Sequence, residues 1–195
     1  MAKRRVTDIA RERGLDPNEV ARVLFEAGVP MARDMVLSAH TWGFNTRRAT
    51  LVEFSGAVIP PSWEFAYARP NLCLRVIGIY APGALDDADS ADFLEESQVD
   101  GAFSIFTNVE EATARFLVQV TDPTKYSAHC VYAMSRLLAS MLAGPIIKGA
   151  RGMDVAAKQL KLYEIAIAQA ATLDARSQQT SVANDFTPSS IAARA

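Results

Sequence analysis

The sequence predicts a mainly α protein, in which a helical bundle carries a small β-rich insertion and ends in an extended C-terminal tail. Three observations lead to this fold class. Apolar residues recur at three- and four-residue steps through the C-terminal half, a strong helix start lies at Asp16, and short β-branched segments fall within residues 46–120. We therefore expect an N-terminal arm or short helix at 1–15, a central domain at 16–178 and a tail at 179–195.

The first helix of the bundle is expected over residues 16–41. Asp16 is an N-cap residue, and Pro17 stands at the first helical position, where its missing N–H costs nothing. Gly28 and Pro30 are expected to break or kink this run, because proline cannot donate the helical hydrogen bond and its ring crowds the preceding turn.

The β-rich insertion is expected over residues 46–120. Arg47–Phe54 is short, rich in β-branched residues and partly alternating, and Leu72–Tyr80 is the strongest strand signal in the chain. Gly78, inside that strand, predicts a bulge or a close backbone approach. The remaining predicted strands are Phe103–Phe106 and Thr113–Val120.

An acidic loop is expected between residues 81 and 100, where seven carboxylates occur without a Lys or Arg. Asp86, Asp87 and Asp89 are its first members and are candidate partner contacts. A solvated loop explains the charge run. A calcium site is the alternative, although the spacing matches no EF-hand loop.

Two further helices are expected over residues 122–143 and 145–177. Asp122 can cap the first and Pro123 can open it, while Gly144-Pro145 is expected to end it. The candidate core residues of the whole chain are Trp42, Phe44, Leu74, Val76, Leu137 and Leu160.

Composition excludes several classes of protein. The chain has 195 residues, is 50% apolar and has a formal net charge of −2, so a basic nucleic-acid coat is excluded. Its apolar runs are interrupted before they reach membrane-spanning length, and its basic start lacks an apolar signal region, so we expect neither a membrane helix nor a secretory signal. Cys73 and Cys130 are too few for a disulfide framework or a zinc site.

The search for catalytic motifs finds no site. His40 and His129 fall on different predicted helices, and no cysteine or carboxylate is placed to act with either of them. No nucleophile elbow, phosphate-binding loop, dinucleotide fingerprint or zinc spacing occurs. We therefore expect a protein that is not an enzyme and that needs no cofactor or metal.

The N-terminal region also has the form of a small helix-turn-helix, with a short helix before Gly14 and a capped helix after it. DNA-reading versions place basic or amide side chains at the start of the second helix. Here Asp16 and Glu19 stand there, although Arg22 and the Lys3-Arg4-Arg5 patch partly compensate. A DNA-binding regulator is thus an alternative, and packing of the helix pair on protein is the preferred interpretation.

Three blocks in fixed order carry a resemblance. They are LSAHTWGFNTRRATL at 37–51, WEFAYARPNLCLRV at 63–76, and VTDPTKY at 120–126 followed by LLASMLAGPI at 137–146. Together they resemble the head-to-tail adaptor proteins of short-tailed bacteriophages, the tail tubular protein A-like family. The resemblance spans residues 20–178, and the charged opening of this chain departs from the family's pattern.

The resemblance implies a structural virion protein rather than an enzyme. Such adaptors form a ring, here expected to be dodecameric, that joins the portal protein to the tail nozzle protein and surrounds the passing DNA. The subunit would be made in the bacterial cytoplasm and carried in the neck of the virion. Phe186, Ile191 and Arg194 of the tail are candidate contacts to the portal or a neighbouring subunit. A neck or head-completion protein of a long-tailed phage is the alternative.

Overall fold

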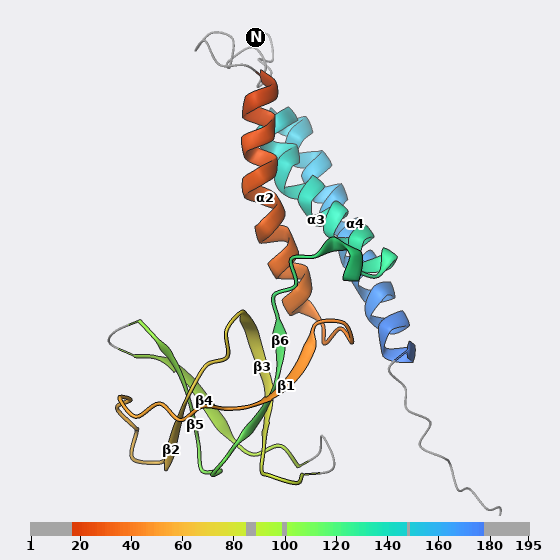
Figure 1. Cartoon of the computed structure of the whole chain (residues 1–195). Helices are drawn as coiled ribbons and strands as arrows, with labels where there is room; N and C mark the ends of the chain where they lie inside the picture. The colour runs from red at the N-terminus through yellow and green to blue at the C-terminus, as the bar shows by residue number, and fades with distance from the viewer. Residues whose placement is uncertain (1–16, 85–88, 99–100, 148, 178–195) are drawn as a thin grey trace, which may run out of the picture.

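The computed structural model describes residues 17–84, 89–98, 101–147 and 149–177. Three long helices lie side by side and project from a smaller β module (Figure 1). We refer to the three helices as the helical arm and to the strands as the β module. The arm consists of α2 (Pro17–Ala39), α3 (Ala128–Ile147) and α4 (Gly149–Ser177).

The expectation of a mainly α fold is wrong. Among the described residues the chain is 48% helical and 23% strand, with three α-helices and six strands in two antiparallel sheets. The strands are four to eight residues long, so each one is a weak signal beside helices of 20 to 29 residues. Paired across two sheets, they nevertheless form a module of their own.

The β module lies between α2 and α3 in the chain. One sheet has the order β1-β6-β3 and the other the order β2-β5-β4, with antiparallel pairing throughout. The strands are β1 (Thr46–Thr50), β2 (Phe65–Ala68), β3 (Cys73–Tyr80), β4 (Phe93–Ser97), β5 (Phe103–Thr107) and β6 (Thr113–Val118).

Backbone contacts join the two sheets to each other at both of their edges. After β1 the chain runs on to pair with β2, where Ala68 N donates to Val52 O at 2.8 Å, and a bridge joins Ile79 of β3 to Ala91 just before β4. The six strands therefore enclose the module's core almost as a small barrel, which leaves few unpaired strand edges.

Gly78 confirms the prediction of a bulge and a close approach. The register of β3 against β6 shifts between Val76 and Gly78. A Cβ at Gly78 would lie 2.7 Å from Ser90 Oγ and 2.8 Å from the Tyr80 hydroxyl, so the position has no room for a side chain.

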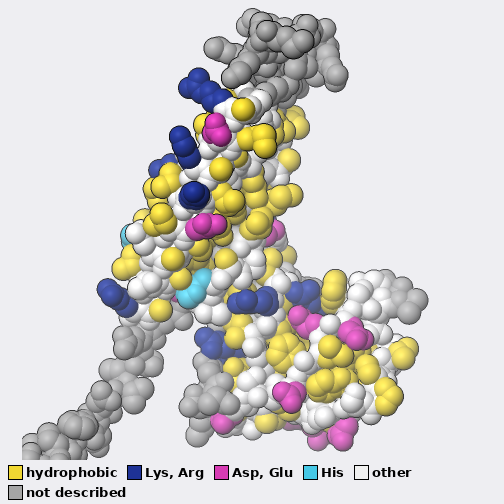
Figure 2. Space-filling model, turned by 180° about the vertical axis from the view of Figure 1, so that it is seen from behind, with side chains coloured by type: hydrophobic (Ala, Val, Ile, Leu, Met, Phe, Trp, Pro, Cys, Tyr) yellow, Lys and Arg dark blue, Asp and Glu magenta, His cyan; other side chains and the backbone are white. Residues whose placement is uncertain are grey.

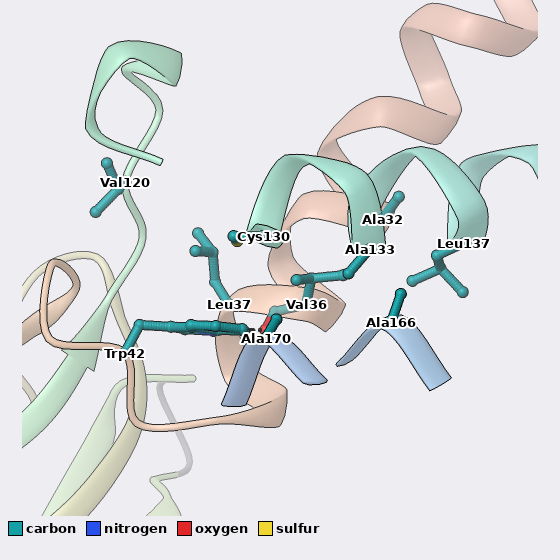
Figure 3. Close-up of a cluster of buried hydrophobic side chains, with 10 residues drawn as sticks. All are labelled: Ala32, Val36, Leu37, Trp42, Val120, Cys130, Ala133, Leu137, Ala166 and Ala170. Carbon is teal, nitrogen blue, oxygen red and sulfur yellow. Dashed lines mark hydrogen bonds between the residues drawn. The ribbon is translucent and has the colours of Figure 1, made fainter. Parts of the chain in front are cut away.

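Two hydrophobic cores stabilise the molecule. The core of the β module lies between its sheets and consists of Leu51, Tyr67, Val76, Ile79, Ile105, Ala112, Ala114 and Phe116. The core of the helical arm is shown in Figure 3, where the indole of Trp42 reaches from the end of α2 toward Ala170 of α4. Half-buried Val118 packs against both cores, so the two are continuous at the junction.

The six candidate core residues are distributed over the two cores and the surface. Trp42, Val76 and Leu137 are buried, and half-buried Phe44 and Leu74 pack against the core of the arm. Leu160 is 43% exposed, so its assignment to the core is wrong. Helix α4 instead buries a narrow strip of small residues, Gly152, Ala166 and Ala170, which brings it close to α3.

The predicted helix boundaries need two corrections. Helix α2 spans Gly28 and Pro30 without a break, within its predicted range, but α3 continues through Pro145 to Ile147 instead of ending at Gly144-Pro145. Asp122 does cap and Pro123 does open a helix, but it is only the 3₁₀ turn Pro123–Lys125, and α3 begins at Ala128. Packing along the arm offsets the hydrogen bond that each internal proline removes.

Candidate assembly surface

The helical arm exposes many large apolar side chains. Met31 on α2 is 59% exposed and Met153 on α4 is 72% exposed. Figure 2 shows hydrophobic side chains along the arm from one end to the other. The exposed set is Val23, Phe25, Met31, Met35, Val131, Tyr132, Ile146, Ile147, Met153, Leu160, Leu162, Ile165 and Leu173. An apolar surface of this extent is typical of a subunit that binds other proteins.

Exposed apolar side chains occur on both outer helices of the arm, and we refer to the exposed apolar side chains of each outer helix as its flank. Helix α3 packs along α4 and against α2, whereas α2 and α4 make little direct contact. Helix α3 is therefore the middle element, and α2 and α4 are the outer ones. Met31 and Met35 belong to the flank formed by α2, and Met153 and Leu160 to the flank formed by α4.

Helix α3 meets, by length and composition, the criterion for a membrane-spanning helix. Its 20 residues have a mean hydropathy of 1.5, so the expectation that no run is apolar enough is wrong on this criterion. The helix supplies Cys130, Ala133, Leu137 and Ala143 to the interior, which accounts for part of its apolar composition. Only 22% of the apolar window is fully buried, while half-buried Met134, Leu138 and Met141 of the same helix pack against the core of the arm.

An apolar groove runs between α2 and α3, beside the segment that connects β6 to α3. Its volume is about 340 Å³, and its lining includes Ala32, Met134 and Leu138. Arg33 stands in its wall and donates from Nε to Asp34 Oδ1 at 2.7 Å. This hydrogen bond raises the pKa of Arg33, so the guanidinium is charged at any physiological pH.

The end of α4 is attached to the turn after α2. His40 Nε2 lies 3.2 Å from Asp174 Oδ2, and the Gly43 backbone N–H donates to the same carboxylate at 3.3 Å. The edge of the His40 ring faces Trp42, with 4.9 Å between the ring centroids. His40 and Asp174 are 134 residues apart in the sequence, so no local motif indicated that they are in contact. Its position between packed elements indicates a structural role.

A second concavity lies on the β module. It has a volume of about 600 Å³ and carries Glu53, Glu110 and Glu111 around the ring of Tyr67. Within the described ranges, no three His, Cys, Asp or Glu side chains are close enough together to hold a metal ion. The lining of this cleft is therefore acidic, with three glutamates beside one buried tyrosine.

The predicted contact residues fall in different parts of the structure. Asp89 is exposed before β4, whereas Asp86, Asp87, Phe186, Ile191 and Arg194 lie outside the described residues. The idea of one acidic loop over 86–100 is wrong in its second half, because Glu95 and Glu96 belong to β4. Glu95 pairs with Arg69 at 3.4 Å, so it is not a free surface charge.

Neither cysteine lies in a reactive environment. Burial raises the pKa of the Cys130 thiol to about 12, and burial also raises the pKa of Cys73, in spite of the opposing hydrogen bond from Arg69. Both thiols are therefore protonated at neutral pH, when a nucleophilic cysteine would be a thiolate.

No protein-family model matches this chain, and no curated protein matches it significantly.

Proposed function

We propose that this chain is the subunit of a head-to-tail adaptor ring in a short-tailed bacteriophage. Twelve copies, in this proposal, join the portal protein to the tail nozzle and surround the conduit through which DNA leaves the head. The subunit acts by assembly and catalyses no reaction. It is made in the cytoplasm of the bacterial host and becomes part of the neck of the virion.

The observation that carries the proposal is the apolar surface on both flanks of the helical arm. Met31 and Met35 are exposed along α2, and Met153 and Leu160 are exposed along α4, with α3 between the two helices. Exposing this much apolar surface to water is unfavourable, by about 25 cal/mol per Å². Contact with neighbouring copies would remove that cost.

The position of the two flanks favours a ring rather than a simple dimer. A two-fold dimer uses one self-complementary patch on each subunit, whereas a closed ring uses two different patches. The α2 flank of one copy against the α4 flank of the next is such a head-to-tail contact. Every subunit then buries both flanks, and no terminal subunit is left with an exposed one.

Two features of the sequence support this assignment. The three ordered blocks at 37–51, 63–76 and 120–146 resemble the adaptor family over most of the chain. The net charge of −2 suits a conduit, because strongly basic walls would bind phosphate and hold the DNA in place.

The proposal is tested by mixing the purified chain with a portal ring of a short-tailed phage and counting bound subunits by native mass spectrometry and electron microscopy. We expect twelve copies on the exit face of the portal. Met31→Glu and Met153→Glu each place a charge in the proposed contact, so each should reduce ring occupancy at least tenfold. Ser55→Glu adds the same charge to an exposed loop of the β module and should leave occupancy unchanged.

Other outcomes would assign the chain to another class. Binding to a preformed long-tailed connector, with no binding to a short-tailed portal, would favour the neck or head-completion alternative. Tight binding to duplex DNA with a steep dependence on salt, and no ring, would favour the DNA-binding regulator. Equal losses for Ser55→Glu and the two methionine variants would argue against the flank contacts.

A further inference from the structure

The groove between α2 and α3 is apolar but has one charged group in its wall. Ala32, Met134 and Leu138 contribute apolar surface, and Val131 in the same lining is 47% exposed. Its volume of about 340 Å³ lies in the range of sites that hold one or two side chains or a small ligand. A groove of this kind suits an apolar side chain.

Arg33 places an oriented positive charge in the wall of the groove. Its Nε binds Asp34, and Asp34 Oδ2 also accepts from Gln119 Nε2 at 2.7 Å. These bonds hold the guanidinium in place and use only one of its five N–H donors. The side chain is 17% exposed, so an added carboxylate would meet a guanidinium that is already oriented and partly desolvated. The apolar lining and the Arg33 guanidinium together favour an occupant in which an apolar residue stands next to an acidic one.

The last 18 residues of the chain contain this combination once. Phe186 is the only aromatic residue after Ser177, and Asp185 directly precedes it. No other acidic residue occurs in this stretch, so the acidic–aromatic pair is unique there.

The distance from the end of α4 to the groove is within reach of this pair. Asp174 is held against Gly43, so the last turn of α4 lies beside the end of α2. From Ala39 back to Arg33 along α2 is about 9 Å, at roughly 1.5 Å per residue. Phe186 stands nine positions after Ser177, and an extended chain of that length spans roughly 30 Å.

We propose that the segment Asn184–Thr187 docks in the α2–α3 groove of its own chain, with Phe186 on the apolar lining and Asp185 at Arg33. Docking covers apolar surface that the single chain otherwise exposes. The inference does not rest on the proposed ring, because it concerns one chain and is measured on the single chain.

The test is disulfide trapping in the full chain. Ser135 lines the groove, and Thr187 follows Phe186, so Ser135→Cys with Thr187→Cys joins the two sites and leaves Phe186 in place. The control pair is Thr172→Cys with Thr187→Cys. Thr172 is exposed near the start of the tail, and an undocked segment would close that shorter loop at least as fast.

We expect the Ser135–Thr187 disulfide to form within single chains at least tenfold faster than the control disulfide, as followed by mass spectrometry of non-reduced protein. Adding Phe186→Ala should remove this advantage, and adding Asp185→Asn should reduce it several-fold. A variant with Thr187→Cys alone reports any exchange with Cys73 or Cys130. Circular dichroism of each variant verifies that the helices are intact.

Three results would overturn the proposal. The control disulfide could form as fast as the groove disulfide, or the groove disulfide could be indifferent to Phe186→Ala; either result shows that the segment does not dock there. A Ser135–Thr187 disulfide found only between two chains would assign the groove to a second copy instead.

Discussion

Trp42 lies where the helical arm meets the β module, within the core of the arm. Its indole is fully buried, and its Nε1 donates to the Val36 carbonyl at 2.9 Å. Phe44 stacks on it with 6.0 Å between ring centroids. One side chain thus satisfies a carbonyl in the last turns of α2 and fills the space under α4.

Replacement of Trp42 should therefore be costly. Trp42→Ala removes a large buried side chain and leaves a cavity, so we expect the free energy of unfolding to fall by about 3–5 kcal/mol. Trp63 is half-buried in the β module, and Trp63→Ala should cost about 1 kcal/mol. Urea unfolding followed by circular dichroism measures both. Equal losses at the two positions would contradict the central role given to Trp42.

At the scale of elements, local sequence signals predicted most of the long segments and failed at their ends. The rule for proline placed a helix end at Gly144-Pro145, yet α3 continues through Pro145 to Ile147. Helix α4 then begins at Gly149, whose φ of 64° is left-handed. Strand β2, Phe65–Ala68, was missed because its four residues include two alanines, which favour helix.

The contact between α3 and α4 depends on small residues at one crossing. A Cβ added at Gly152 would lie 3.1 Å from the Ala143 carbonyl oxygen and 3.5 Å from Gly144 Cα. Both neighbours are backbone atoms of a helix, so they can yield only if α3 and α4 move apart. A Cβ added at Gly144 would meet no heavy atom within 4 Å.

The two glycines therefore form a matched pair for substitution. Gly144→Ala should stabilise the protein by up to about 1 kcal/mol, because alanine favours helix over glycine. Gly152→Ala receives the same propensity gain but crowds the crossing, and we expect a net loss of about 1–3 kcal/mol. Thermal and urea unfolding of the two variants compare these effects. A stabilising Gly152→Ala would show that the helices can separate without cost.

At the scale of the whole molecule, the sequence predicted a β-rich segment between helices. It did not predict that this segment forms two sheets with a hydrophobic core of their own. The second core depends on pairs such as Tyr67 with Ile105, which are distant in sequence and meet only when β2 pairs with β5. The exposed apolar surface of the helical arm was missed for a related reason. Apolar periodicity predicted that Leu160 faces the core, and periodicity cannot distinguish burial in the chain from burial against a partner.

The two modules are joined by a buried polar residue as well as by apolar contacts. Asn45 is fully buried in the turn between α2 and β1. Its side-chain N–H donates to the Leu37 carbonyl of α2 at 3.0 Å, while its own carbonyl accepts from Val118 N of β6 at 2.8 Å. Asn45 thus binds the last turn of a helix and the central strand of a sheet at once, which should make the unfolding of the two modules cooperative.

Asn45→Asp tests this coupling. The change removes the donor to Leu37 and places a carboxylate in a fully buried site, so we expect about 1–3 kcal/mol of destabilisation from the unmet hydrogen bond and more where the charge persists. Asn71→Asp, at an exposed position, should change stability by less than about 0.5 kcal/mol. Hydrogen exchange, followed separately in α4 and β5, should show both modules losing protection together in Asn45→Asp. Loss confined to one module would mean that the arm and the β module fold independently and that the Asn45 bridge does not couple them.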